Sequence, residues 1–145
     1  MIIRAYQQTD SYEVFQLFQN TIRVTNSPDY SSAEIEAWIS CTNEISLNER
    51  LLNSYTLVAV KDNKIIGYGN IQKNMLDHLY IHHNYVHQGV ATKLCDLLER
   101  QTQLPILVHA SITAKPFFEK RGYHTLNKRD NFINNQLLIN YEMQK

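Results

Sequence analysis

Residues 79–92 read Leu-Tyr-Ile-His-His-Asn-Tyr-Val-His-Gln-Gly-Val-Ala-Thr. A strand-like run leads into a loop with one glycine, and a helix with one apolar face begins at Gly89. Backbone N–H groups at a helix N-terminus are unpaired, and with the helix dipole they favour an anion. Gly89 lets the backbone approach a phosphate closely, Ala91 keeps the entry small, and Thr92 adds a hydroxyl donor. The segment predicts either a phosphate-binding turn or an ordinary strand-to-helix turn.

Two better-known phosphate motifs are excluded by the residues of this loop. A P-loop ends in Gly-Lys-Ser/Thr, and that ending is missing here. The dinucleotide-binding fingerprint needs three glycines, and two of them are missing. If the loop binds phosphate, it is therefore neither a P-loop nor a dinucleotide-binding loop.

The flanking sequence predicts an α/β fold with a mixed sheet, because strand-like and helix-like segments alternate. Capping boxes at Asp10 with Glu13 and at Ser31 with Glu34 start two helices, and Thr113 caps a later one. The turn Asp62-Asn63 predicts a hairpin. We expect strands at 2–6, 55–60, 65–71, 75–81, 105–110, 123–127 and 136–143, and further helices at 46–52, from Gly89, and at 114–121.

Composition limits the class of protein. The 145 residues favour one domain, residues 1–145, and carry 14 Lys and Arg against 14 Asp and Glu. Without a basic excess we expect no nucleic-acid partner and no membrane surface. Two cysteines make no disulfide framework, and the N-terminus lacks the apolar run of a signal peptide, so a cytoplasmic protein is expected.

Three stretches together resemble the GNAT superfamily of N-acetyltransferases, in its YafP-like branch. Residues 79–94 are similar to motif A, whose Gln/Arg-x-x-Gly-x-Gly/Ala pattern falls on 86–91 with Val86 in first place. Residues 110–123 look like motif B, and Tyr30-Ser31-Ser32-x-x-Ile35-x-Ala37-Trp38 is typical of the branch. The stretches occur in the expected order and span nearly the whole chain.

The resemblance implies a mixed sheet of about seven strands, with splayed central strands and helices on both faces. It implies acetyl-CoA as cosubstrate and no metal. The acetyl group would pass to a primary amine of a small molecule or peptide by direct attack. The implied cofactor-binding residues are Leu79, Tyr80, Ile81, Val86, His87, Gln88, Gly89, Val90, Ala91, Thr92, Ser111, Phe117 and Phe118.

Asp77 is the first candidate for the base that takes the amine proton. It stands two residues before Leu79, and we expect it on the same strand face. His109, at the end of the next strand, is the second candidate, since histidine titrates near neutrality. Each residue also has an alternative without catalysis. Asp77 could be a solvated acid at the start of a strand, and His109 could be a hydrogen-bonded or simply exposed histidine.

Phe118 occupies the place where many relatives carry a tyrosine that protonates the leaving thiolate. A phenyl ring donates no proton, so Ser111 is the remaining candidate donor, or the thiolate leaves unassisted. This departure also leaves open a non-catalytic acyl-CoA-binding module as an alternative function.

Three sets of residues remain. His78, His82, His83 and His87 invite a zinc hypothesis, but in a strand and loop these side chains diverge, so no metal is expected. Tyr30 and Trp38 are candidate acceptor-pocket residues, with simple core packing as the alternative. The acceptor's identity, and the choice between monomer and homodimer, stay open.

Overall fold

The computed structural model describes residues 1–145 and contains a seven-stranded mixed sheet. The strands are β1 (Ile2–Ala5), β2 (Tyr55–Lys61), β3 (Lys64–Gln72), β4 (Met75–Ile81), β5 (Leu107–Ser111), β6 (His124–Ile133) and β7 (Gln136–Gln144). Their order in the sheet is β1-β2-β3-β4-β5-β7-β6. Only β4 and β5 run parallel to each other. The predicted mixed sheet is confirmed.

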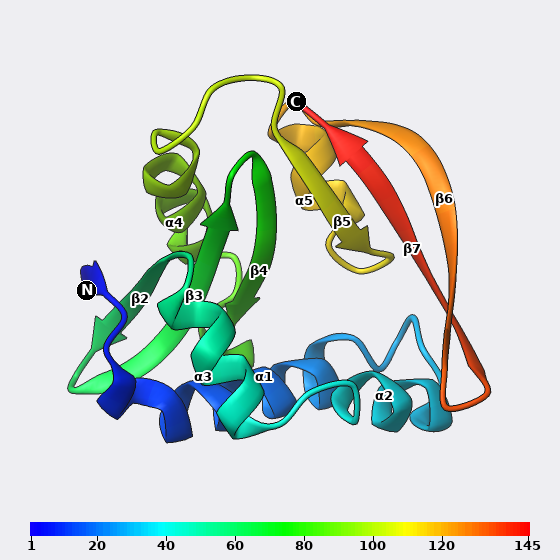
Figure 1. Cartoon of the computed structure of the whole chain (residues 1–145), viewed down its shortest axis with the longest axis horizontal. Helices are drawn as coiled ribbons and strands as arrows, with labels where there is room; N and C mark the ends of the chain where they lie inside the picture. The colour runs from blue at the N-terminus through cyan, green and yellow to red at the C-terminus, as the bar shows by residue number, and fades with distance from the viewer.

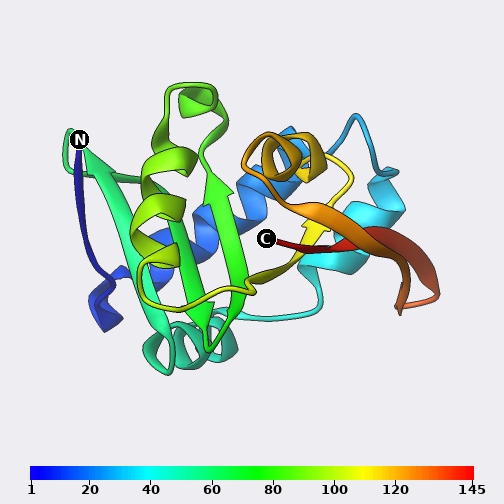
Figure 2. The ribbon, with the colours of Figure 1, turned by 90° about the horizontal axis from the view of Figure 1, so that it is seen from above.

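Helices cover both faces of this sheet (Figures 1 and 2). The helices are α1 (Ser11–Thr25), α2 (Ser32–Ile39), α3 (Glu44–Leu52), α4 (Val90–Glu99) and α5 (Lys115–Lys120), with short 3-10 turns η1 (Gln8–Asp10) and η2 (His83–Tyr85). The first three pack a buried cluster on one face, and α4 and α5 pack another on the opposite face. None of the helices combines the length and apolar character that crossing a bilayer requires.

The centre of the sheet opens between β4 and β5. Their parallel pairing joins only Met75 to Leu107 and Leu76 to Val108. Beyond these pairs the strands diverge, and Figure 1 shows the gap widening towards α1 and α2. The splayed central strands are therefore present, and β4 keeps a free edge over most of its length.

Most predicted elements are found where they were expected, but two caps are not. Glu13 accepts the Ile65 N–H at 2.7 Å and so ties α1 to β3, whereas Asp10 pairs with Arg4 at 2.8 Å. Thr113 donates its hydroxyl to Asp29 at 2.7 Å instead of capping α5. Each side chain found a partner distant in sequence, which local spacing does not reveal. The Ser31 and Glu34 capping box is confirmed.

The last hairpin is longer than predicted. Strand β6 continues to Ile133, and the turn is formed by Asn134 and Asn135, both in the left-handed region. Residues 127–131 are polar, so they lack the alternating apolar pattern from which strands are predicted. They lie at the sheet edge, where a strand needs no buried face.

Candidate functional site

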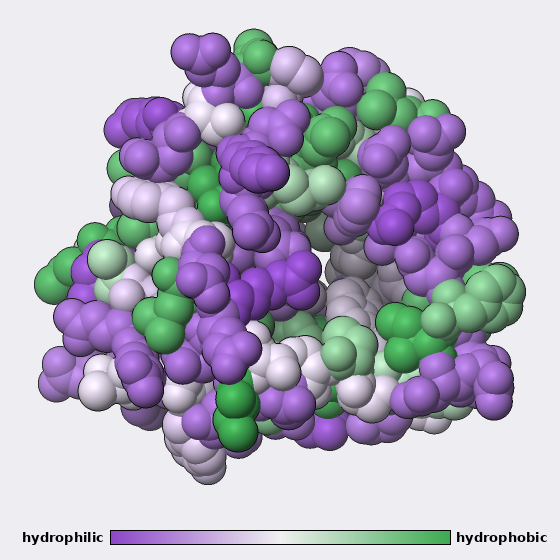
Figure 3. Space-filling model, in the orientation of Figure 1, coloured by the Kyte–Doolittle hydropathy of each residue, from purple (hydrophilic) through white to green (hydrophobic).

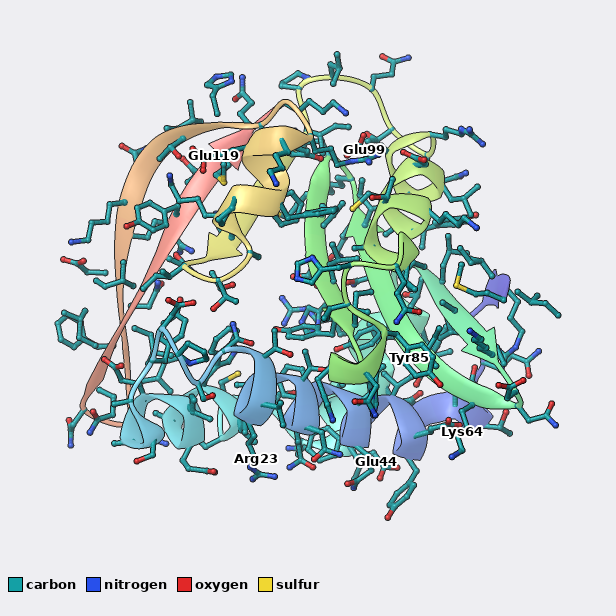
Figure 4. The ribbon with its side chains drawn as sticks, turned by 180° about the vertical axis from the view of Figure 1, so that it is seen from behind. Arg23, Glu44, Lys64, Tyr85, Glu99 and Glu119 are labelled. Carbon is teal, nitrogen blue, oxygen red and sulfur yellow. The ribbon has the colours of Figure 1, made fainter.

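The loop before α4 presents a run of unpaired backbone donors. Gly89 is the N-cap of α4 with φ of 84°, and His87 also has a positive φ of 61°. No backbone N–H from Val86 to Thr92 donates a well-formed hydrogen bond within the chain. His87, Gln88 and Gly89 are exposed, as is Thr92. Free donors at a helix N-terminus can bind an anion, and this loop lies beside Tyr85 in Figure 4.

The free edge of β4 leads from this loop into the gap. His82 donates its N–H to the Ile66 carbonyl at 2.8 Å, and Tyr80 faces Tyr68 on β3. Alternate residues of a strand direct their backbone groups to opposite edges. The N–H groups of Leu79 and Ile81 therefore face the gap, where an extended ligand can pair with them.

Side chains of the same strand line both sides of the sheet. Those of Leu79 and Ile81 pack against the cluster under α4, and that of Tyr80 packs against the cluster under α1. The Tyr80 side chain thus lies on the opposite face from its neighbours, and its backbone groups are directed to β3 and not to the gap.

Asp77 is the extra residue of a β-bulge in β4, and this changes its predicted orientation. The register pairs Ile71 with Leu76 and Asn70 with His78, which leaves Asp77 without a partner on β3. Its Oδ2 lies 2.8 Å from Nε of Arg50 on α3 and accepts from Nδ2 of Asn70 at 3.1 Å. The carboxylate therefore lies on the α3 side, opposite Leu79. The expected shared face was wrong because the bulge breaks the two-residue alternation.

His109 lies near Asp77 where β4 and β5 begin to separate. Both residues line a cavity of about 400 Å³, together with Arg50. Nε2 of His109 is 3.5 Å from Glu142 on β7, its cross-strand neighbour. Figure 3 shows this side of the molecule hollowed between the β2–β4 half and the β5–β7 half. The two predicted bases are thus brought together at one cavity.

Ser111 is held at the end of β5. Its Oγ accepts the Ala114 N–H at 3.0 Å and lies 3.5 Å from Nδ2 of Asn26. Asn26 is buried, and it follows α1 directly. The hydroxyl therefore fixes the start of α5, and its own proton stays available to a ligand in the gap.

The two phenylalanines of α5 differ in exposure. Phe118 is 2% exposed and packs edge-on against Phe117 and Tyr123. Phe117 is half-buried against the same cluster. Tyr123 donates its hydroxyl to Glu99 at 2.8 Å, and this contact raises the pKa of Tyr123 further above a value that burial already raises. The Tyr123 hydroxyl is therefore engaged with Glu99.

Tyr30 and Trp38 form one aromatic pair below the gap. Their ring centroids are 5.3 Å apart in an edge-to-face arrangement. The buried Tyr30 hydroxyl donates to the Ile139 carbonyl at 2.6 Å and accepts the Ile112 N–H at 3.0 Å. Tyr30 therefore links β7 to the segment after β5, and the half-buried Trp38 is the member with surface to offer a ligand.

Two residues beside Asp77, namely Arg50 and Asn70, were not predicted from the sequence, and His78 was considered there only as a metal ligand. The His78 ring lies among Phe18, Tyr68 and Tyr80, and burial there lowers its pKa to about 4, although Asp77 opposes the shift. The buried Tyr68 hydroxyl, 2.9 Å from Nδ1 of His78, has no other acceptor. It therefore donates to Nδ1, and the neutral ring carries its proton on Nε2. No local pattern marks these residues, since the fold brings them together.

The other histidines of the predicted run point in different directions. The ring centroids of His82 and His83 are 4.2 Å apart, His87 is exposed, and His78 stacks on Phe18 of α1. No group of three or more His, Cys, Asp and Glu side chains is arranged to hold a metal ion.

Comparison with known proteins relates this geometry to one family. The family model for the acetyltransferase (GNAT) domain matches residues 26–145. The N-acetyltransferase YafP of Escherichia coli (strain K12) is 33% identical over 128 residues, which are 88% of this chain and 83% of that protein. A GCN5-related N-acetyltransferase from Rhodopseudomonas palustris has a TM-score of 0.95 at 32% identity, covering 99% of this chain and 94% of its own.

A more distant solved structure shares the fold. It is the PaiA N-acetyltransferase from Thermoplasma acidophilum in complex with coenzyme A. Its TM-score is 0.77 at 19% identity, and the match covers 99% of this chain and 97% of that one.

Proposed function

The chain belongs to the GNAT superfamily of acetyltransferases, in its YafP-like branch, and we propose that it transfers the acetyl group of acetyl-CoA to a primary amine. One observation carries the proposal. The unpaired N–H groups from Val86 to Thr92 adjoin the free edge of β4. Acetyl-CoA has a pyrophosphate joined to an extended arm that carries amides. The loop N–H groups suit the pyrophosphate, and the adjoining strand edge suits the amides of the arm.

The residues present fit acetyl-CoA along its length. The loop and first turn of α4 would hold the pyrophosphate, with Gly89 allowing close approach of the backbone. Leu79 and Ile81 would pair with the pantetheine amides through their gap-facing backbone groups. The thioester would then lie near the β4 bulge, at the cavity shared by Asp77 and His109. The coenzyme A in the PaiA complex supports this class of ligand.

The chemistry needs a proton acceptor and a donor to the developing oxyanion. An ammonium acceptor gives one proton to Asp77, and the freed lone pair attacks the thioester carbon. A gap-facing N–H of β4 stabilises the oxyanion. The carbon–sulfur bond breaks, the thiolate leaves, and the second amine proton passes to the thiolate or to water. The products are the N-acetyl amide and CoA.

Phe118 bears on the last step, because its ring supplies no proton to the thiolate. A thiol pKa of about 8.5 makes the thiolate a fair leaving group without help. Ser111 remains the predicted alternative donor to the thiolate, since its own proton is not used within the chain. The presence of Phe118 in place of a proton-donating tyrosine also favours the alternative function, a module that binds acyl-CoA without turnover.

Two measurements separate these functions. Calorimetry with acetyl-CoA should show saturable binding, and a panel of amines should release CoA thiol in proportion to acetylated product. Binding without release from any amine supports the non-catalytic module. Absence of binding at saturating acetyl-CoA contradicts both.

Asp77→Asn tests the base. We expect kcat to fall about 10²-fold or more, because positioned general bases contribute on that order. The Kd for acetyl-CoA should stay unchanged, because Asp77 lies on the α3 side of the sheet. Asp130→Asn, on the exposed β6 edge, is the matched control. Wild-type turnover of the Asp77 variant at every pH would exclude Asp77 as the base.

A further inference from the structure

The cavity beside the proposed thioester position carries a guanidinium with free hydrogen-bonding capacity. Arg50 lies in the last turn of α3, and its side chain is 54% exposed. Its Nε is 2.8 Å from Asp77, but the two terminal nitrogens make no hydrogen bond within the chain. A guanidinium fork of this kind binds a carboxylate through two parallel hydrogen bonds.

Asp77 is anchored by only one of its two oxygens. Arg50 and Asn70 both contact Oδ2, at 2.8 and 3.1 Å. Oδ1 has no partner, and it is not among the buried atoms that lack one. The Asp77 side chain is 16% exposed. Its second oxygen is thus fixed in position and open to a ligand.

These two free groups form a pattern of adjacent opposite charges. The fork of Arg50 and Oδ1 of Asp77 flank the same ion pair, and His109 lies on the other wall of the cavity. Lys73 adds a second positive charge at the rim. An α-amino acid carries a carboxylate and an ammonium on one carbon, and so matches these two adjacent groups in the sign of their charges. A polyamine or a peptide N-terminus brings no such carboxylate.

We propose that the acceptor is a free α-amino acid, with its carboxylate on the terminal nitrogens of Arg50 and its amine at Oδ1 of Asp77. The inference rests on the proposed acetyl transfer and names its substrate class. Arg50 is the residue that selects the acceptor. The cavity of about 400 Å³ is large enough for a molecule of this size.

Matched pairs of acceptors test the proposal, each pair an amino acid and the amine left when its carboxylate is removed. Phenylalanine with phenethylamine, tryptophan with tryptamine, and leucine with 3-methylbutylamine are suitable. We expect kcat/KM for CoA release to be about tenfold or more higher for the amino acid, as charge-assisted hydrogen bonds provide. Equal or faster release with the decarboxylated amines overturns the proposal and leaves acetyl transfer intact.

Arg50→Gln then assigns the preference to this side chain. We expect kcat/KM for the amino acid to fall about tenfold or more further than kcat/KM for its decarboxylated partner, because both acceptors share any effect of Arg50 on Asp77 and only the amino acid loses a carboxylate contact. Arg50→Lys keeps the positive charge but loses the guanidinium fork. Its preference for the amino acid should lie between those of the wild-type protein and Arg50→Gln. Arg23→Gln is the matched control, since Arg23 pairs with Glu36 and points away from the sheet beneath α1 in Figure 4. An undiminished preference in Arg50→Gln overturns the assignment.

Calorimetry separates a failure of this inference from a failure of the proposed function. If acetyl-CoA binds but no amine releases CoA, phenylalanine is titrated into CoA-loaded protein. Binding that Arg50→Gln weakens about tenfold supports the carboxylate site even without transfer. Absence of binding to the wild-type protein overturns it. Thermal unfolding of each variant confirms that it is folded.

Discussion

Gly89 is the single residue on which the phosphate-binding loop depends most directly. Its φ of 84° lies in the left-handed region, and a Cβ built there meets no atom within 4 Å. In the protein without cofactor, a side chain at this position would therefore be disfavoured by the backbone conformation and not by a steric clash. Left-handed backbone costs an L-residue about 1–2 kcal/mol, and more when it is β-branched.

Gly89→Val should therefore weaken acetyl-CoA binding by about tenfold or more, because the loop relaxes and the N–H groups no longer converge. Gly89→Asn is the control, since asparagine tolerates positive φ. Measured by calorimetry, it should bind acetyl-CoA more tightly than Gly89→Val but less tightly than the wild-type protein, because its side chain lies where Gly89 allows the backbone to approach the phosphate. Equal affinity of the valine variant would show that the loop does not hold the pyrophosphate.

Single residues also mark the limit of what sequence predicted about the site. The phosphate loop could be located because a strand, a glycine and a helix follow one another in sequence. Asp77 could be named, but its side could not, because a bulge leaves no local signal in the sequence. Arg50 was missed because it comes from α3, and only the folded chain brings α3 over the β4 bulge.

Among the elements, β3 allows α4 to pack closely through two glycines. A Cβ on Gly69 would lie 3.0 Å from the His78 carbonyl oxygen and 3.0 Å from Leu98. A Cβ on Gly67 would be 2.8 Å from the terminal methyl of Ile81, which can rotate away. The backbone of β4 has no such freedom.

We expect Gly69→Ala to lower the free energy of unfolding by about 1–3 kcal/mol, as overpacking of a core does. Gly67→Ala should cost less, since the atoms closest to its Cβ, at 2.8 and 3.2 Å, belong to the side chains of Ile81 and Val90 and not to the backbone. Urea unfolding followed by circular dichroism compares the two. A greater loss in Gly67→Ala would contradict this account of how α4 packs on the sheet.

The same elements show why most of the fold was predictable. Hairpin β2–β3 carries its turn residues, Asp62 and Asn63, between two apolar runs, and both turn residues have positive φ. Helix α4 carries an apolar face in its own sequence. In contrast, β6 continues through polar residues to Ile133, and its length depends on pairing with β7. Local patterns identify elements that bury one face, and edge strands need none.

The whole molecule should lose stability on mild acidification because of His78. Burial lowers its pKa to about 4, from an ordinary 6.5 in the unfolded chain. Between these values the unfolded state binds more protons, so stability rises with pH through this window and falls as pH decreases. The loss amounts to about 3 kcal/mol at most.

His78→Gln should flatten the dependence of unfolding free energy on pH between about 6.5 and 4. Glutamine is the suitable replacement, since its amide oxygen can still accept from Tyr68. Glu99 provides the contrast. Burial acts to raise the pKa of Glu99, but hydrogen bonds from Arg121, Lys145 and Tyr123 lower it below its ordinary value. The stability that the ionised Glu99 contributes is therefore lost only at more acidic pH. An unchanged slope in the His78 variant would place the titrating group elsewhere.

The brief pairing of β4 with β5 also affects how the molecule opens. Two residue pairs join the β1–β4 half of the sheet to the β5–β7 half. Backbone hydrogen bonds resist local opening in proportion to the contacts around them, so amides at this junction should exchange with solvent sooner than those inside either half. An extended cosubstrate bound along the free edge of β4 would act there as an additional strand. Acetyl-CoA would then slow amide exchange in β5, and cofactor loading would make one cooperative unit of two.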